Sequence, residues 1–146
     1  MARRAARTAG SEALGRWAVR LPLKTKRWNE PVAPDDGLRV LVCRFRPRGV
    51  RKEDETWDLW AKNLAPSREL LAAFQGKSGP PLPWKDFARQ YRTEMKAERD
   101  LIRSLAERLR LGERMTLLCS SSCVDPDRCH RTLLAGLLEH EATAGA

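Results

Sequence analysis

The residues of this chain that could do chemistry are concentrated in one short stretch near its C-terminus. Three of the four cysteines and one of the two histidines lie between Cys119 and His130, and Arg131 follows directly. Neighbouring cations and a helix N-terminus lower the pKa of a cysteine, so a thiol in such a stretch can act as a nucleophile. The same residue types can also bind zinc or fill a core as small hydrophobic side chains.

The spacing of these residues disfavours zinc. The pattern is C-x3-C-x5-C-H, without the C-x2-C pair typical of structural zinc sites, even if Cys43 served as a distant ligand. Cys129 and His130 are adjacent on an expected helix, where successive side chains diverge by about 100° and do not converge easily on one ion. We therefore predict no metal ligands and no cofactor, and keep a zinc-stabilised interaction domain as a third hypothesis.

A helix N-terminus is predicted directly before the last of these cysteines. The sequence D-P-D at residues 125–127 offers an N-cap aspartate, a proline at the first helical position and an acid in the first turn. We expect a helix over residues 126–140, with residues 129–131 in its first two turns. Free backbone N–H groups and the helix dipole favour anions there.

The four cysteines are therefore expected to differ in reactivity. Cys129 is predicted to be the most acidic thiol and the candidate catalytic nucleophile, with His130 as the candidate acid or base. Cys43 and Cys119 lie within hydrophobic runs and are expected to be buried with raised pKa values, whereas Cys123 lies in a serine-rich loop and is expected to be exposed. In the alternative interpretation, Cys129 is a small core residue and His130 a helix-surface residue.

A second stretch, V-C-R-F-R-P-R-G-V, is rich in arginine and follows a predicted buried strand. Its arginines emerge where cations are costly unless an anion or an acid meets them. A solvated basic loop is one alternative, but a phosphate- or carboxylate-binding pocket would account for both stretches together. The candidate ligand-binding residues are Arg44, Arg48 and Arg131, with Lys26 and Tyr91 as second-rank candidates.

The elements that must position these residues alternate between strands and helices. Apolar runs predict strands over 21–27, 38–45 and 115–120. Helical spacing predicts helices over 52–65, after Ser67, and over 84–111 with a break near 96–100. This order implies an α/β fold, a mostly parallel short sheet with helices packed on its faces. The cysteine stretch and the arginine-rich stretch then both fall at carboxyl ends of strands, where such folds bind ligands.

Length and charge favour one domain and a tail. The 146 residues suit a single small α/β domain over 21–146, preceded by a disordered basic tail over 1–20. Residues 1–27 carry eight basic side chains and one acid, whereas the remainder carries 20 basic and 18 acidic side chains. Weak, non-specific affinity for nucleic acid is therefore expected from the tail.

The chain has no apolar run long enough to span a bilayer and no secretory signal at its start. We expect a cytoplasmic protein without a membrane partner. In a reducing compartment, paired structural disulfides are not expected from the four cysteines.

Several motifs together resemble the domain-of-unknown-function 488 family of small bacterial and archaeal proteins. They are K-R at residues 26–27, P-D-D-G-L-R-V-L-V-C-R-F-R-P-R-G at 34–49, D-x-W-x-K-x-L-A-P-S at 58–67, W-x-x-F-x-x-x-Y at 84–91, and L-L-C…C-H-R at 117–131. The resemblance covers residues 22–140 and implies a small α/β fold, but no established activity. Many relatives have Asp in place of Cys43, Trp in place of Arg46, and an H-N-H-type sequence in place of C-H-R.

Two principal hypotheses for function follow. The first is an enzyme acting on a phosphorylated or nucleotide-like small molecule in an anion-binding pocket, with the arginines stabilising negative charge. The alternative is a non-catalytic nucleic-acid-binding or sensing module.

Overall fold

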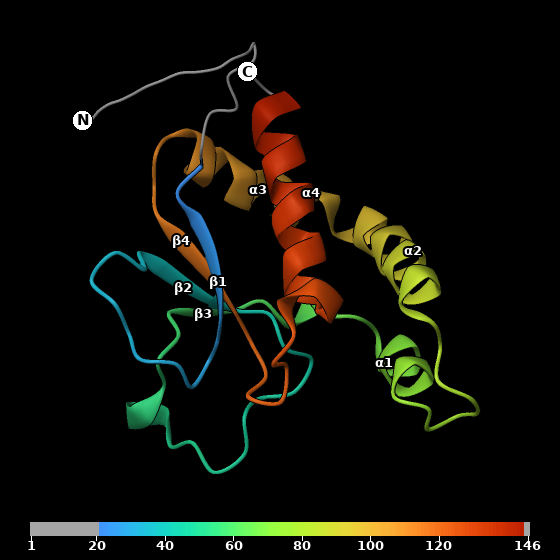
Figure 1. Cartoon of the computed structure of the whole chain (residues 1–146). Helices are drawn as coiled ribbons and strands as arrows, with labels where there is room; N and C mark the ends of the chain where they lie inside the picture. The colour runs from blue at the N-terminus through green and yellow to red at the C-terminus, as the bar shows by residue number, and fades with distance from the viewer. Residues whose placement is uncertain (1–20, 145–146) are drawn as a thin grey trace.

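A computed structural model describes residues 21–144 (Figure 1). Its centre is a four-stranded, fully parallel sheet with strand order β1-β4-β2-β3. The strands are β1 (Leu23–Arg27), β2 (Leu38–Leu41), β3 (Leu59–Trp60) and β4 (Met115–Cys119). The predicted parallel sheet of an α/β fold is confirmed. The predicted tail lies outside the described residues.

The register of the sheet brings the ends of β2 and β4 together. Leu41 stands opposite Leu118, and the backbone N–H of Val42 donates to the Leu118 carbonyl at 2.9 Å. Cys43 follows β2 and Cys119 is the last residue of β4, so the two cysteines reach the same carboxyl edge. Parallel pairing therefore accounts for the meeting of two residues 76 positions apart in the sequence.

The helices are α1 (Arg68–Phe74), α2 (Trp84–Met95), α3 (Arg99–Arg110) and α4 (His130–Ala144). The Ser67 hydroxyl caps α1 by accepting the Leu70 N–H at 3.1 Å. A short 3₁₀ segment, η3 (Lys96–Glu98), separates α2 from α3, which confirms the predicted break. Gly112, with φ of 92°, ends α3 because a left-handed residue cannot continue the helix.

The helix predicted over 52–65 is wrong. The segment forms two 3₁₀ turns, η1 (Lys52–Asp54) and η2 (Lys62–Leu64), on either side of β3. The edge of β2 supplies its hydrogen-bond partners, since Asp58 N–H donates to the Arg39 carbonyl and Ala61 N–H donates to the Leu41 carbonyl, both at 2.8 Å. Helical spacing of its apolar residues is thus overridden by pairing with the sheet.

The two faces of the sheet have different partners. Val40, Val42 and Leu117 lie in one core cluster with side chains from all four α-helices. Leu41 and Leu118 lie in a second cluster, covered by tryptophans from the loops, Trp28 and Trp57, whose rings meet edge to face at 6.3 Å. All four cysteines of the chain belong to this second cluster or pack against it.

Candidate active site

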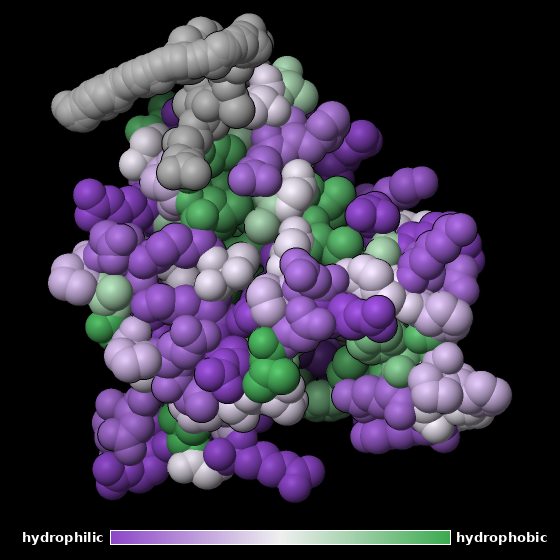
Figure 2. Space-filling model, in the orientation of Figure 1, coloured by the Kyte–Doolittle hydropathy of each residue, from purple (hydrophilic) through white to green (hydrophobic). Residues whose placement is uncertain are grey.

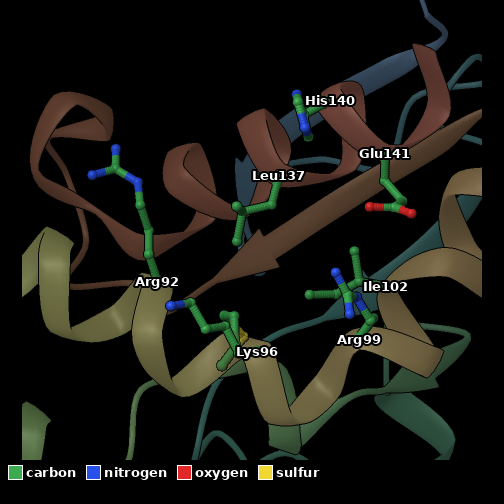
Figure 3. Close-up of a pocket in the computed structure, with 8 residues that line it drawn as sticks. Arg92, Lys96, Arg99, Ile102, Leu137, His140 and Glu141 are labelled. Carbon is green, nitrogen blue, oxygen red and sulfur yellow. The ribbon is translucent and has the colours of Figure 1, made fainter. Parts of the chain in front are cut away.

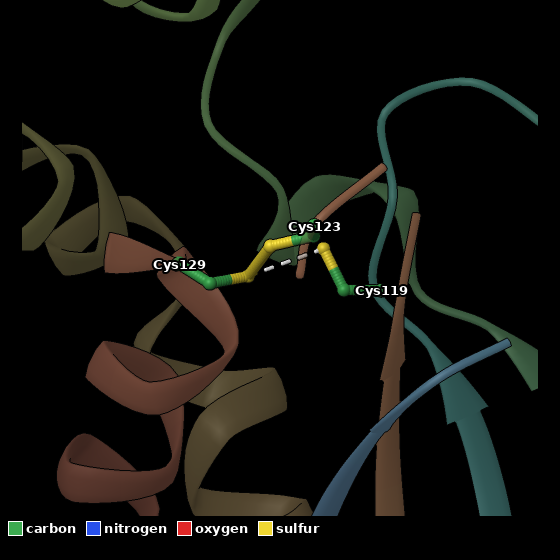
Figure 4. A group of neighbouring side chains, drawn as sticks. All are labelled: Cys119, Cys123 and Cys129. Atoms are coloured by element: carbon green, nitrogen blue, oxygen red, sulfur yellow. Dashed lines mark hydrogen bonds between the residues drawn. A yellow bond between two sulfur atoms is a disulfide. The ribbon is translucent and has the colours of Figure 1, made fainter. Parts of the chain in front are cut away.

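Three cysteine sulfurs converge at the carboxyl edge of the sheet. The Sγ atoms of Cys119, Cys123 and Cys129 all lie within 4.8 Å of one another (Figure 4). Cys123 and Cys129 form a disulfide, with Cα atoms 6.5 Å apart, and the Cys129 Sγ lies 3.3 Å from the Cys119 Sγ. The expectation that the chain holds no disulfide is therefore wrong for this pair. A turn closed by the Cys123 N–H and the Ser120 carbonyl, at 3.0 Å, folds the serine-rich loop back toward β4.

Cys129 is not part of a helix, contrary to the prediction. Asp125 is an N-cap, as predicted, since its side chain accepts the Asp127 N–H at 3.0 Å. The turn that it caps is a short 3₁₀ segment, η4 (Pro126–Arg128), and not the first turn of the α-helix. Cys129 is extended, with φ of −134° and ψ of 139°, and α4 begins at His130. Because Cys129 precedes the helix, its Sγ and the His130 ring can both approach Cys119.

Cys119 is the thiol that the structure favours as a thiolate. The hydrogen bond from the Cys43 thiol is the largest influence lowering the pKa of Cys119; burial acts in the opposite direction, and His130 and the Ser120 N–H add to the lowering. The pKa of Cys43 is raised by the same hydrogen bond, by burial and by the charge on Cys119. The expected raised pKa is thus confirmed for Cys43 and wrong for Cys119, because Cys119 gathers the donors that Cys43 lacks.

His130 is held in one orientation beside this thiolate. Its Nε2 lies 2.7 Å from the Val42 carbonyl, which fixes a hydrogen on that nitrogen, and its Nδ1 lies 4.0 Å from the Cys119 Sγ. The ring packs against the buried Tyr91 ring at 5.7 Å. The Tyr91 hydroxyl donates to the Leu64 carbonyl at 2.7 Å, and burial raises the pKa of Tyr91. A second proton on His130, at Nδ1, would point at the Cys119 sulfur and form an imidazolium–thiolate pair.

A cavity of about 630 Å³ opens above the cysteines, within the size range of small-molecule sites. It is lined by all four cysteines, His130, the serines at 120–122 and several aromatic side chains. Four arginines also line it: Arg44, Arg46, Arg48 and Arg128. The cavity thus unites the cysteine stretch with the basic stretch, as the sequence predicts from their positions at strand ends.

Two of the four arginines are already engaged by the protein. Arg44 donates to the Pro66 and Ala65 carbonyls, both at 3.1 Å, and Arg46 pairs with the Glu55 carboxylate at 2.7 Å. Within residues 21–144, Arg48 and Arg128 form no ion pair, and both are exposed. Arg44 likewise forms no ion pair within residues 21–144, so three of the four arginines bring uncompensated positive charge to the cavity, and the exposed Arg48 and Arg128 are the most accessible to a ligand. Arg128 was not predicted, and its only sequence signal is its place beside Cys129.

The remaining predicted ligand-binding residues lie outside the cavity lining. Lys26 donates to the Asp36 carboxylate and to the Pro31 carbonyl, both at 2.9 Å. Tyr91 lies behind the His130 ring. Arg131 is only 5% exposed, and among the described residues its Nε and Nη1 have no hydrogen-bond partner. It forms no ion pair within residues 21–144, so it adds an unpaired positive charge to the first turn of α4.

The same three cysteines are the residues that could hold a thiophilic metal ion. Sulfurs within 4.8 Å of one another are close to the spacing of thiolates around zinc, and the His130 Nδ1 lies beside them. The objection drawn from adjacent helical positions does not hold, because Cys129 precedes α4. Such binding would require the Cys123–Cys129 disulfide to be reduced, since bonded sulfurs are not thiolate ligands.

A second, smaller cavity lies between α2 and α3 on one side and α4 on the other (Figure 3). Its volume is about 250 Å³, and its polar lining is Arg92, Lys96, Arg99, His140 and Glu141. These side chains come from exposed helix positions, apart from the half-buried Glu141, which pairs with Arg103 at 3.1 Å. It contains no thiol or hydroxyl nucleophile among its lining residues. Charge alone distinguishes it.

The fold and the cavity define a small parallel α/β protein with a cysteine–histidine cluster at the carboxyl edge of its sheet. The chain belongs to the DUF488-N3a family, whose description is the active DUF488-N3 subclade and whose model matches residues 23–142. The family resemblance seen in the sequence is confirmed.

Relatives in two bacteria support this assignment. The chain is 34% identical over 116 residues to the uncharacterized protein Rv3073c of Mycobacterium tuberculosis, which covers 80% of this chain and 92% of that protein. It is also 34% identical over 116 residues to the uncharacterized protein YeaO of Escherichia coli, which covers 80% of this chain and 96% of that protein. No solved structure matches the chain.

Proposed function

We propose that this protein is an enzyme that uses the Cys119 thiolate as a nucleophile on an anionic small molecule, phosphorylated or nucleotide-like. The observation that carries the proposal is the environment of Cys119: a thiol with a lowered pKa, lining a cavity, with the His130 Nδ1 4.0 Å away. Activated cysteine nucleophiles have this combination of a thiolate and an adjacent histidine. The description of the family as an active subclade agrees with it.

The lining of the cavity supports an anionic substrate with a planar group. Arg48 and Arg128 offer cations without ion-pair partners among residues 21–144, and the start of α4 adds the positive end of a helix dipole. Trp28 and Phe45 offer aromatic faces on which a nucleobase could stack. Cys119 would attack the electrophilic centre, and a proton carried by the His130 Nδ1 would pass to the leaving group.

This proposal changes the role expected of Cys129. A sulfur already bonded to Cys123 cannot act as the nucleophile, so the thiolate role passes to Cys119. His130 keeps its expected role as acid or base. Arg44 is assigned to holding the chain at residues 65–66, through its two bonds to backbone carbonyls.

Protection of Cys119 by anions tests the proposal. Iodoacetamide should label Cys119, and phosphate or adenosine monophosphate should slow that labelling because the anion occupies the cavity. Arg48→Ala and Arg128→Ala should each weaken the protection, whereas Arg92→Ala, in the second cavity, should not. Labelling of Cys119 that no anion affects would contradict the proposed substrate class.

The cytoplasm and a weak nucleic-acid partner remain part of the proposal. None of the helices within residues 21–144 is long and apolar enough to cross a bilayer. Polar side chains dominate the face of the molecule shown in Figure 2. A disulfide in a cytoplasmic protein is usually catalytic or redox-sensing rather than structural, which agrees with the position of Cys123–Cys129 beside a thiolate.

A further inference from the structure

The Cys119 sulfur is in contact with a disulfide rather than with inert side chains. Its Sγ lies 3.3 Å from the Cys129 Sγ, which is bonded to Cys123. Cys129 carries no thiol hydrogen in this state, so the contact is between the free Cys119 sulfur and a disulfide sulfur. Thiol–disulfide exchange proceeds by this approach of a thiolate to one sulfur of a disulfide.

Cys129 is shared by two possible partners. Cys119 and Cys123 both have their sulfurs within 4.8 Å of the Cys129 sulfur, so either can bond to it without unfolding of the chain. Of the two, Cys119 has the His130 ring beside it, with Nδ1 4.0 Å from its Sγ, to stabilise a departing thiolate. Exchange should therefore end with Cys123 bonded to Cys129 and Cys119 free, which is the arrangement in the structure.

We propose that Cys119, Cys129 and Cys123 form a thiol–disulfide relay that returns an oxidised Cys119 to its thiolate form. The inference rests on the proposed function in one respect, that Cys119 is the nucleophile to be protected. It adds two residues, Cys129 and Cys123, with a resolving role that the anion-binding chemistry does not require. The oxidant is a hydroperoxide and the final reductant is a dithiol.

The relay balances in four steps. The Cys119 thiolate attacks the peroxide, so an S–O bond forms, the O–O bond breaks, and the departing oxygen takes a proton; sulfur loses two electrons and becomes a sulfenic acid. The Cys129 thiol attacks that sulfur, so an S–S bond forms and the hydroxyl leaves with the thiol proton as water. The Cys123 thiolate attacks Cys129, and the electron pair of the Cys119–Cys129 bond leaves on Cys119. An external dithiol reduces Cys123–Cys129 and is itself oxidised.

Burial gives the relay a direction. Cys119 and Cys129 are each 3% exposed, whereas Cys123 is half-buried in the loop after β4. A protein dithiol can therefore reach Cys123 more readily than either of the other two sulfurs. Reduction would enter at the loop while the nucleophile stays within the cavity.

Disulfide mapping with hydrogen peroxide tests the relay. The reduced full-length chain would be treated with stoichiometric peroxide, quenched in acid, alkylated and mapped by mass spectrometry without reduction. The wild type should yield Cys123–Cys129 with Cys119 free to alkylate. Cys123→Ser should stop the relay one step earlier, with a Cys119–Cys129 disulfide and loss of Cys119 alkylation. Val124→Ala, an exposed position in the loop between Cys123 and Cys129 and outside the cavity lining, is the matched control and should leave the wild-type pairing unchanged.

Three results would overturn the relay. They are free Cys119 and Cys129 thiols in oxidised Cys123→Ser, a Cys43–Cys119 disulfide in the wild type, and a reduced chain that binds one zinc ion per molecule through these thiols and forms no disulfide. Circular dichroism on each variant separates loss of the fold from loss of the pairing. The outcome is independent of anion protection, so failure of the relay and failure of the proposed substrate class can be told apart.

Discussion

Each end of the parallel sheet holds a buried charged group, but only the group at the amino end forms ion pairs with cationic side chains. At the amino end, Asp36 is 1% exposed and pairs with Lys24 at 2.7 Å, with Lys26 at 2.9 Å and with Arg39. Burial alone would raise the pKa of Asp36, but hydrogen bonds from Lys24, the Ala33 N–H and Lys26 outweigh it and hold the pKa well below its usual range.

At the carboxyl end, the charge of the Cys119 thiolate meets only hydrogen-bond donors and an imidazole. Arg48 and Arg128 stand near it without carboxylate partners in the described part of the chain. The difference separates two uses of charge in one small fold. A carboxylate surrounded by cations holds strands together, whereas a thiolate and cations without carboxylate partners are available to a ligand.

The largest expected effect comes from removing the charge of Asp36 at the amino end of the sheet. Asp36→Asn should lower the free energy of unfolding by about 3 kcal/mol, because it leaves Arg39, 4% exposed, without its anion. The matched control is Asp35→Asn, which removes an exposed partner of Lys24 and should lower the free energy of unfolding far less, because solvent screens that pair. Urea unfolding of both variants measures the difference. Equal losses would show that the Asp36 cluster is not the stabilising element.

The same cluster predicts an acid-dependent stability. Because the folded-state pKa of Asp36 is depressed, its contribution is fully present above the unfolded pKa of about 3.9 and is lost as the pH falls toward the folded value. The free energy of unfolding of the wild type should therefore decline below about pH 4, and the decline should be shallower in Asp36→Asn. Parallel slopes in the two proteins would contradict this assignment.

A change beside Cys119, at the carboxyl end of the sheet, should alter the reactivity of this thiol more than the stability of the fold. Cys43→Ala removes the main hydrogen-bond donor to Cys119, so labelling of Cys119 should require a higher pH. The free energy of unfolding should change by about 1 kcal/mol or less, since only one small buried side chain is shortened. Iodoacetamide labelling and urea unfolding of the same preparation compare the two quantities. An unchanged labelling profile would show that Cys43 does not tune Cys119.

The smallest expected effect on either end comes from removing residues 1–20. The deletion removes five arginines and one acid, so non-specific binding to DNA should weaken and its salt dependence should flatten. Filter binding across a salt series measures both. Labelling of Cys119 should not change. An unchanged salt slope would place the nucleic-acid surface on the basic stretch around Arg39 to Lys52.

The parts of the fold that depend on local sequence could be predicted. Buried strands, the Ser67 cap and the break after Met95 follow from apolar periodicity and capping chemistry over a few residues. The meeting of the Cys43 and Cys119 regions also followed, because carboxyl ends of parallel strands share one edge.

The details of the site could not be predicted, because they depend on single backbone conformations and on residues distant in sequence. One extended residue, Cys129, places two side chains beside Cys119 that a helix would have separated. The pKa of Cys119 is lowered by groups that are far apart in the sequence, namely the Cys43 thiol, the Ser120 N–H and His130, so Cys43 keeps its proton in preference to Cys119. The helix predicted over 52–65 was wrong for a similar reason, since the backbone of this segment hydrogen-bonds to the edge of β2 and not to its own next turn.

The pH dependence of cysteine labelling tests the central claim most directly. In the chain isolated without reductant, only Cys43 and Cys119 are free, so iodoacetamide labelling followed by peptide mapping compares these two thiols in one molecule. Cys119 should label well below the ordinary thiol pKa of about 8.5, and Cys43 should label only after unfolding. If Cys119 instead labels only near or above that pH, or only after unfolding, it is a core residue and not the nucleophile of this protein.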